Sequence, residues 1–197
     1  MRVDLALISE WIAPSSRVLD LACGDGTLLR YLQTYKNVTG YGLEIDPDYI
    51  LACMEQDVNV IQTDLDAGLS DFDEDSFDYV VMSQSLQAMY FPDKLLSEML
   101  RIGREGIVSF PNFGHWKCRL QHAFGGVMPT TRSLTHEWYD TPNIHLCTIR
   151  DFEDLCTERN FKILQRTAVD HSHRETLGMR LLPNLLAEIA LFRFSKN

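Results

Sequence analysis

This chain has little of what would make it a disulfide-bonded, zinc-binding or membrane protein. Its five cysteines are odd in number and include no Cys-x-x-Cys pair. Neither a disulfide framework nor a zinc site is therefore expected, and a reducing compartment is favoured. No stretch is apolar for long enough to span a bilayer, and the opening Met1-Arg2-Val3-Asp4 lacks the character of a signal peptide. We expect a cytoplasmic protein that does not bind membranes.

Positive charge is also scarce. The chain has 18 Lys and Arg residues against 28 Asp and Glu residues, for a formal net charge of -10. Its basic residues are scattered, so electrostatic attraction to phosphate backbones is not expected, which argues against nucleic acid as a partner. The 197 residues, 45% of them apolar, suffice for one buried core and predict a single domain over residues 1–197.

The most informative segment runs from Val18 to Leu29 and reads VLDLACGDGTLL. An apolar strand carries Asp20 near its end, and Gly24 and Gly26 then turn the chain into a helix. The glycines let a ligand approach the backbone, and free amides at the helix start attract an anionic group. A dinucleotide fingerprint would place a third glycine where Leu29 stands, so NAD is disfavoured. The Asp20 carboxylate suits a positively charged ligand, such as the ammonium and sulfonium groups of S-adenosylmethionine (SAM).

Two further acids follow strands of the same predicted sheet. Glu44 ends a strand about twenty residues past the glycine loop, which is the spacing of a ribose-binding carboxylate. Asp64 follows the third strand, at the next carboxyl end along the sheet edge, where an acid could receive the adenine amino group. Asp46 is read instead as a helix N-cap, with Pro47 at the first helical position.

In this order and spacing the motifs resemble those of the class I SAM-dependent methyltransferases. Asp20, Gly24 and Gly26 match the first motif of that class. Glu44 matches the second motif and Asp64 the third. The resemblance implies SAM, or its demethylated product S-adenosylhomocysteine (SAH), as the cofactor.

One position departs from that pattern. Ala22 stands where these methyltransferases usually have glycine, and its methyl group narrows the backbone's approach to the methionine part of the ligand. The candidate cofactor-binding residues are Asp20, Ala22, Gly24, Gly26, Glu44, Ile45, Asp64, Leu65 and Ser83.

Three longer blocks resemble the MetW family of methionine biosynthesis proteins. They read SQSLQ over 83–87, IVSFPNFGHW over 107–116 and EWYDTPNIHLCT over 137–148. That resemblance implies a role beside the homoserine O-acyltransferase MetX, which MetW proteins accompany. Homoserine O-acyltransferase is therefore the partner that we expect.

Hydrophobic periodicity predicts alternating strands and helices, and hence a parallel sheet. We expect an α/β fold: one doubly wound domain with a mostly parallel, seven-stranded sheet of the class I methyltransferase, Rossmann-like type. The resemblance adds that the last strand lies antiparallel beside the fifth. Helices are predicted over 2–12, 26–34, 47–56, 92–102 and 149–159, and strands over 16–21, 38–44, 58–63, 77–82, 106–110, 161–169 and 186–194.

The segment over about 111–147 is an unusually long connection, rich in aromatic residues and histidines. Connections of this length are often lids or binding surfaces, although an insertion that only packs on the body is the alternative. As a lid it would place His145 or His115 over the methyl end of the cofactor as a general base. For each histidine the alternative to a general base is a structural role, in which the ring only forms hydrogen bonds within the fold. His171 and His173 offer at most two ligands, so no metal site is expected.

Two functions remain open on the sequence. The chain is either a SAM-dependent methyltransferase acting on a small-molecule acceptor, or a SAM-binding subunit that supports homoserine acylation. Methyl transfer depends mainly on positioning and leaves no obligatory catalytic triad to find. The family resemblance favours the supporting role. In that role the aromatic connection would present Trp116, Trp138 or Tyr139 to the acyltransferase.

Overall fold

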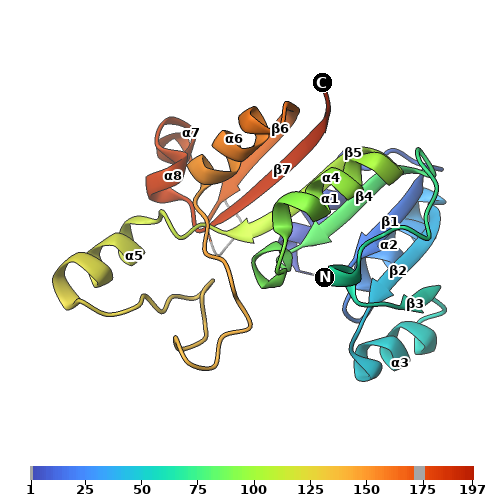
Figure 1. Ribbon diagram of the computed structural model, residues 1–197, viewed down its shortest axis with the longest axis horizontal. Coiled ribbons are helices and arrows are strands. Elements are labelled where there is room, and N and C mark those ends of the chain that lie inside the picture. The colour runs from blue at the N-terminus through green and yellow to red at the C-terminus, as the bar shows by residue number, and fades with distance from the viewer. Residues whose placement is uncertain (1, 171–175) are drawn as a thin grey trace.

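The computed structural model describes residues 2–170 and 176–197, and within them one seven-stranded sheet forms the centre (Figure 1). The strand order is β3-β2-β1-β4-β5-β7-β6. Strands β1 to β5 run parallel, whereas β7 lies antiparallel between β5 and β6. This is the expected class I methyltransferase order, and the antiparallel position of the last strand is confirmed. The strands are β1 (Arg17–Leu21), β2 (Thr39–Glu44), β3 (Val60–Gln62), β4 (Phe77–Ser83), β5 (Gly103–Pro111), β6 (Phe161–Val169) and β7 (Ile189–Lys196).

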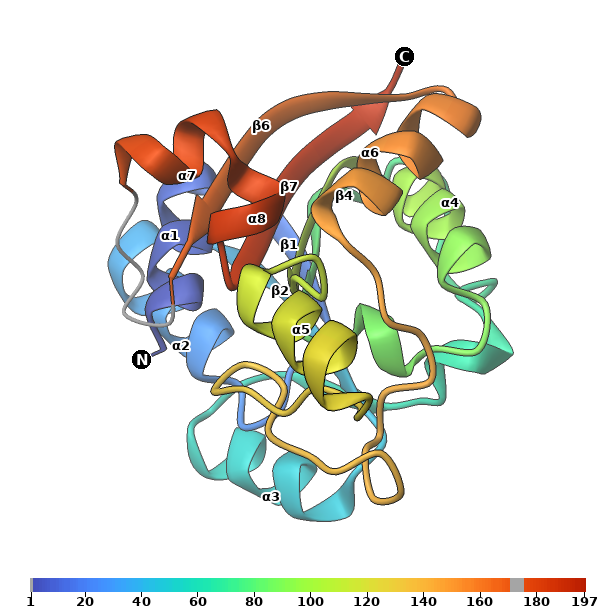
Figure 2. The same ribbon diagram turned by 90° about the vertical axis from the view of Figure 1, so that its left-hand side faces the viewer.

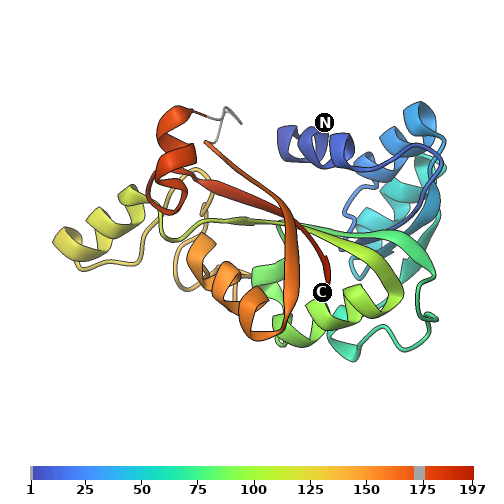
Figure 3. The same ribbon diagram turned by 90° about the horizontal axis from the view of Figure 1, so that it is seen from above.

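Helices cover both faces of the sheet, as the view from above shows (Figure 3). Helices α1, α2 and α3 contribute to one buried apolar cluster, and α4 and α6 contribute to the other. Burial of the two sheet faces explains why the central strands β1 and β4 are buried along most of their length. These helices are α1 (Val3–Trp11), α2 (Thr27–Lys36), α3 (Pro47–Glu55), α4 (Pro92–Ile102) and α6 (Ile149–Glu158).

Local capping chemistry fixes several helix ends. The side chain of Asp46 accepts a hydrogen bond from the Asp48 amide at the start of α3, with Pro47 at the first position. Thr148 and Asp151 form the reciprocal capping box that opens α6. Both arrangements confirm the sequence prediction, because caps depend on residues only a few positions apart.

The element ends agree with the prediction to within two residues except at the fifth and last strands. Strand β5 begins at Gly103 rather than 106, because Gly103 already pairs with β4 and Glu105 pairs with both β4 and β7. Strand β7 begins at Ile189 rather than 186, because the short helix α8 (Pro183–Leu186) precedes it. The prediction did not include short helices such as α7 (Leu177–Leu181). They have too few residues for an apolar period to be detected. His171 and His173 lie outside the described residues.

The long connection forms an arm over residues 111–147. It carries α5 (Trp116–Leu120) and a π-helical turn (Gln121–Gly125), and it extends beyond the end of the sheet (Figures 1 and 2). Gly126 ends the turn with φ +62°, a left-handed conformation that glycine adopts without strain. Within the described part of the chain, no helix is long and apolar enough to cross a membrane.

Candidate cofactor site

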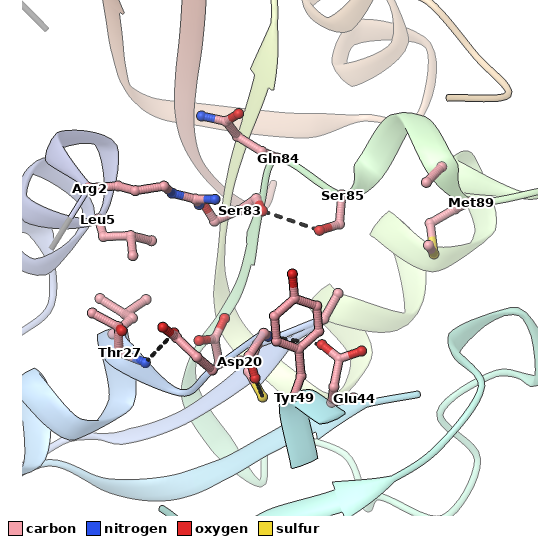
Figure 4. A pocket seen from close by; sticks show the side chains of 16 residues that line it. Arg2, Leu5, Asp20, Thr27, Glu44, Tyr49, Ser83, Gln84, Ser85 and Met89 are labelled. Atoms are coloured by element: carbon pink, nitrogen blue, oxygen red, sulfur yellow. Dashed lines mark hydrogen bonds between the residues drawn. The ribbon is translucent and has the colours of Figure 1, made fainter. Parts of the chain in front are cut away.

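A cavity of about 610 Å³ opens at the carboxyl ends of β1, β2 and β4 (Figure 4). Its position follows from the strand order, because β1 and β4 are neighbours whose following helices lie on opposite faces of the sheet. Five of the nine predicted cofactor residues line the cavity: Asp20, Ala22, Gly24, Glu44 and Ser83.

The glycine loop after β1 runs through three left-handed residues. Ala22 has φ +52°, Gly24 has φ +57° and Gly26 has φ +75°. A side chain at Gly24 would meet no atom within 4 Å, and this glycine lines the cavity. The loop backbone is therefore open to a ligand at Gly24.

Gly26 lies against α3 and the residues that follow it. A Cβ built there would meet Cys53 Sγ at 3.0 Å and Val58 Cγ1 at 3.2 Å. The glycine thus faces α3 and the segment after it, and it does not line the cavity. Its absent side chain permits close packing and a left-handed start to α2, and its contact with the cofactor stays a prediction.

Glu44, the last residue of β2, is tied to the glycine loop. Its Oε2 accepts a hydrogen bond from the Gly24 amide at 2.9 Å. Its Oε1 accepts hydrogen bonds from the amides of Ile45 at 2.8 Å and Asp46 at 3.1 Å. The side chain is only 7% exposed, but it lies at the cavity wall. A carboxylate has about four acceptor positions, so Glu44 keeps capacity for a ligand donor after these three bonds.

Asp20 is the buried anion of the site. The residue is 3% exposed, and among residues 2–170 and 176–197 the structure records no hydrogen bond or ion pair to its carboxyl group. Burial raises the pKa of Asp20 to about 7, the charge of Arg2 lowers it, and the charge of Glu44 raises it. The carboxylate lines the cavity, so a cationic group bound there would relieve the cost of its burial.

The sequence prediction missed the part of the site that α1 contributes. Arg2 lies on the cavity wall and donates through Nη2 to Ser83 Oγ at 2.8 Å, joining the start of the chain to the end of β4. Only the spatial proximity of these distant segments reveals this contribution, since Arg2 belongs to no motif. The missed lining residues include Arg2, Leu5, Tyr49, Gln84, Ser85 and Met89.

Three other predicted residues lie away from the cavity wall. Asp64 accepts a hydrogen bond from the Asp66 amide at 3.0 Å and thereby caps a 3-10 turn (Leu65–Ala67). Ile45 is 58% exposed, whereas Leu65 is buried in the core. The role of Asp64 toward adenine and the cofactor contacts of Ile45 and Leu65 remain predictions.

Neither candidate histidine lines the cavity. His115 is buried ahead of α5, where burial lowers its pKa, Glu188 raises it and Lys117 lowers it. His145 is exposed, and its ring lies 3.3 Å from the Tyr90 carbonyl oxygen. The His145 amide donates to the Gln87 carbonyl at 2.9 Å, which anchors the returning end of the arm beside the cavity wall.

Cys23 lies within the glycine loop, with its Sγ 3.8 Å from the Sγ of Cys53. Burial raises the pKa of both thiols, so neither is an activated nucleophile. Within the described residues, no three His, Cys, Asp or Glu side chains gather as ligands for a metal ion would.

The comparisons with known proteins agree with this architecture. The family model described as "Methionine biosynthesis protein MetW" matches residues 2–194. This chain belongs to the MetW family. A relative in Rhodopirellula baltica, named "Bifunctional methionine biosynthesis protein MetXA/MetW", is 34% identical over 205 residues, which cover 100% of this chain. The MetW chain spans 33% of that relative's length.

Solved structures show the same fold at low sequence identity. An S-adenosylmethionine-dependent methyltransferase from Mesorhizobium loti has a TM-score of 0.70 at 15% identity, covering 96% of this MetW chain and 95% of its own. A SAM-dependent methyltransferase from Archaeoglobus fulgidus has a TM-score of 0.69 at 15% identity, covering 99% and 92%. The [4+2]-cyclase SpnF also has a TM-score of 0.69 at 15% identity, covering 99% and 81%. Because one of these proteins is named for a different reaction, the fold alone does not assign methyl transfer to MetW.

Proposed function

We propose that this MetW protein binds SAM or SAH in the cavity beside Asp20 and Glu44 and supports the homoserine O-acyltransferase MetX. The observation that carries the ligand assignment is Asp20, a buried carboxylate without a hydrogen-bond partner among the described residues that faces the cavity. The ammonium or sulfonium of SAM would supply the missing positive charge.

Glu44 supports the same ligand at the next strand end. Its carboxylate is held in place by three backbone amides and retains acceptor capacity toward the cavity. A ribose hydroxyl that donates to this ionised acceptor would form a charge-assisted hydrogen bond, which is stronger than a neutral one.

The support for MetX as the partner has two independent parts. The Rhodopirellula baltica relative is named as a single MetXA/MetW protein, and fusion keeps two units at high effective concentration. The arm also exposes large aromatic side chains, with Phe124 86% exposed, Trp138 72% and Tyr139 71%. Aromatic residues of this kind dominate the energetics of protein interfaces when a partner buries them.

Catalytic methyl transfer is the competing function. It requires an acceptor positioned in line with the methyl group, and many acceptors also require a general base. Neither His115 nor His145 lines the cavity, so the residues around the ligand provide binding more clearly than base catalysis. This favours the supporting role over the methyltransferase role.

Two measurements test the proposal. Calorimetry with the purified protein should show binding of SAM and SAH and no measurable binding of NAD, because Leu29 stands in place of the third glycine. Addition of the protein to homoserine O-acyltransferase should raise the rate of homoserine acylation. No binding of SAM or SAH would overturn the ligand assignment, and an unchanged acylation rate would overturn the supporting role.

A further inference from the structure

The first turn of α1 reaches over one end of the cavity. Arg2, the residue that precedes α1, and Leu5 of α1 extend toward the pocket, while Glu44 and Tyr49 lie on its other side (Figure 4). Asp20 lies between them. The cavity therefore has a cationic end beside α1 and an anionic end beside β2, with a buried carboxylate between the two.

Asp4 is the group that fixes Arg2 in this position. Its side chain is completely buried, and its carboxylate accepts from Arg2 Nε at 3.2 Å and from Arg2 Nη2 at 3.2 Å. It also accepts from Ser83 Oγ at 3.0 Å and Gln84 Nε2 at 3.0 Å. One of these bonds reaches Oδ1 and three reach Oδ2, so both oxygens are engaged. Asp4 does not line the cavity and acts by orienting Arg2.

Arg2 keeps one edge of its guanidinium group for a ligand. Nε and Nη2 are bound to Asp4 and Ser83, whereas Nη1 makes no hydrogen bond to any described residue. The side chain is 54% exposed and lines the cavity. A fixed, planar donor group with a free edge is well suited to a carboxylate.

Arg2 and Asp20 line the same cavity. Arg2 is ion-paired with Asp4 but keeps the Nη1 edge open, whereas the Asp20 carboxyl group has no partner among the described residues. A ligand with only a positive charge would satisfy Asp20 but would leave the open edge of Arg2 without an acceptor. A ligand with only a negative charge would meet the reverse problem. A zwitterion satisfies both groups, with its carboxylate on Arg2 and its ammonium on Asp20.

We propose that Arg2, oriented by Asp4, binds the α-carboxylate of the ligand and selects nucleosides that carry a free α-amino acid. This inference rests on the proposed function and adds the residue that discriminates among adenosine derivatives. The order Arg2, Asp20, Glu44 along the cavity then matches the order carboxylate, ammonium, ribose along the ligand. A nucleoside thioether without the amino-acid end would engage Glu44 but neither charged group beside α1.

The test compares two ligands that share the adenosine thioether. SAH carries the amino acid, and 5′-methylthioadenosine lacks it. By calorimetry, wild-type protein should bind SAH more tightly than 5′-methylthioadenosine. Arg2→Met should lower the affinity for SAH about 10- to 100-fold, because a charge-assisted pair is lost. It should change the affinity for 5′-methylthioadenosine less than about twofold, and Arg2→Lys should fall between Arg2→Met and wild type for SAH.

Arg30→Met is the matched control, because Arg30 is an exposed arginine on α2 that does not line the cavity. It should leave both affinities unchanged. Equal losses for the two ligands in Arg2→Met, or an unchanged affinity for SAH, would overturn the assignment of Arg2. Wild-type protein that binds neither ligand would instead overturn the proposed function, and circular dichroism of each variant identifies any loss of folding.

Asp4→Asn is a second test of the same proposal. It should weaken SAH binding selectively, and an equal loss of affinity for both ligands would contradict the positioning role of Asp4.

Discussion

The carboxylate of Glu44 accepts a hydrogen bond from the amide of Gly24 at 2.9 Å. This bond joins the end of β2 to the loop after β1, so the two predicted ligand-binding motifs form one unit. Glu44 thus holds the backbone of a loop that lines the same cavity. Changes at either residue should therefore affect binding through both direct contact and loop position.

Glu44→Ala should weaken SAM binding by about 1.5–3 kcal/mol, or about 10- to 100-fold, because a charged acceptor of hydrogen bonds is removed. Calorimetry measures the change. Glu10→Ala is the control, since Glu10 is exposed on α1 and does not line the cavity. Equal affinity for Glu44→Ala and the parent would remove Glu44 from the site.

Gly24 and Gly26 should respond differently to substitution. Gly26→Val should destabilise the fold, because a side chain would strike Cys53 and Val58 from a left-handed backbone. Gly24→Ala should cost only the left-handed strain, about 1–2 kcal/mol, while its methyl group weakens ligand binding at the cavity. Thermal unfolding and SAM binding, measured on both variants, separate the two effects. A fully stable Gly26→Val protein would contradict the packing role that we assign to Gly26.

Ala22→Gly should make the ligand-free protein more stable by about 0.5–1 kcal/mol, because Ala22 has φ +52° and glycine adopts this conformation without a Cβ clash. The gain is limited by the greater entropy of glycine in the unfolded chain. Urea unfolding measures it. A loss of stability would show that the packing of the Ala22 methyl group outweighs the backbone strain.

The affinity for SAH should rise with pH through about 7, the value to which burial raises the pKa of Asp20. Below that pH the ligand-free carboxyl group is protonated, and an ammonium group can pair with it only after the proton leaves. Binding should therefore release a proton near neutral pH. Calorimetry in buffers of different ionisation enthalpy measures the release. Asp20→Asn should bind SAH more weakly and lose this proton release, whereas an unchanged pH profile would contradict the role of Asp20.

The same pKa shift predicts how the stability of the ligand-free protein varies with pH. The pKa of Asp20 is about 7 in the folded state, above the ordinary value of an aspartate, so the folded protein binds more protons than the unfolded chain between about pH 4 and 7. The contribution of Asp20 to stability therefore falls as pH rises through this window. Asp20→Asn should remove that part of the pH dependence in urea unfolding measured at a series of pH values.

Trp138→Ala should weaken association with homoserine O-acyltransferase by about tenfold or more, because exposed aromatic residues become dominant contacts when a partner buries them. Tyr35→Ala is the matched control, since Trp138 and Tyr35 are both 72% exposed and Tyr35 lies on α2, away from the arm. Co-purification and an acylation assay provide the two measurements. Unchanged association and unchanged acylation would exclude Trp138 from the partner surface.

Sequence by itself determined the features that depend on neighbouring residues. Several local features follow from short spacings, because the groups that interact are only a few positions apart. They are the caps at Asp46 and Thr148, the left-handed glycine loop, and Glu44 at the end of β2. The family resemblance added the antiparallel last strand, which periodicity does not encode. The strand order then brought Asp20, Gly24 and Glu44 together as predicted.

Only the tertiary structure decided the contacts between distant segments. Ser83 bonds to Asp4 across 79 positions, and nothing near Arg2 in the sequence marks it as part of a ligand site. The space for a side chain at Gly26 depends on Cys53 and Val58, which α3 and the segment after it bring against the loop. His115 and His145 were placed by the packing of the arm, since a long connection has no period that fixes where its side chains lie.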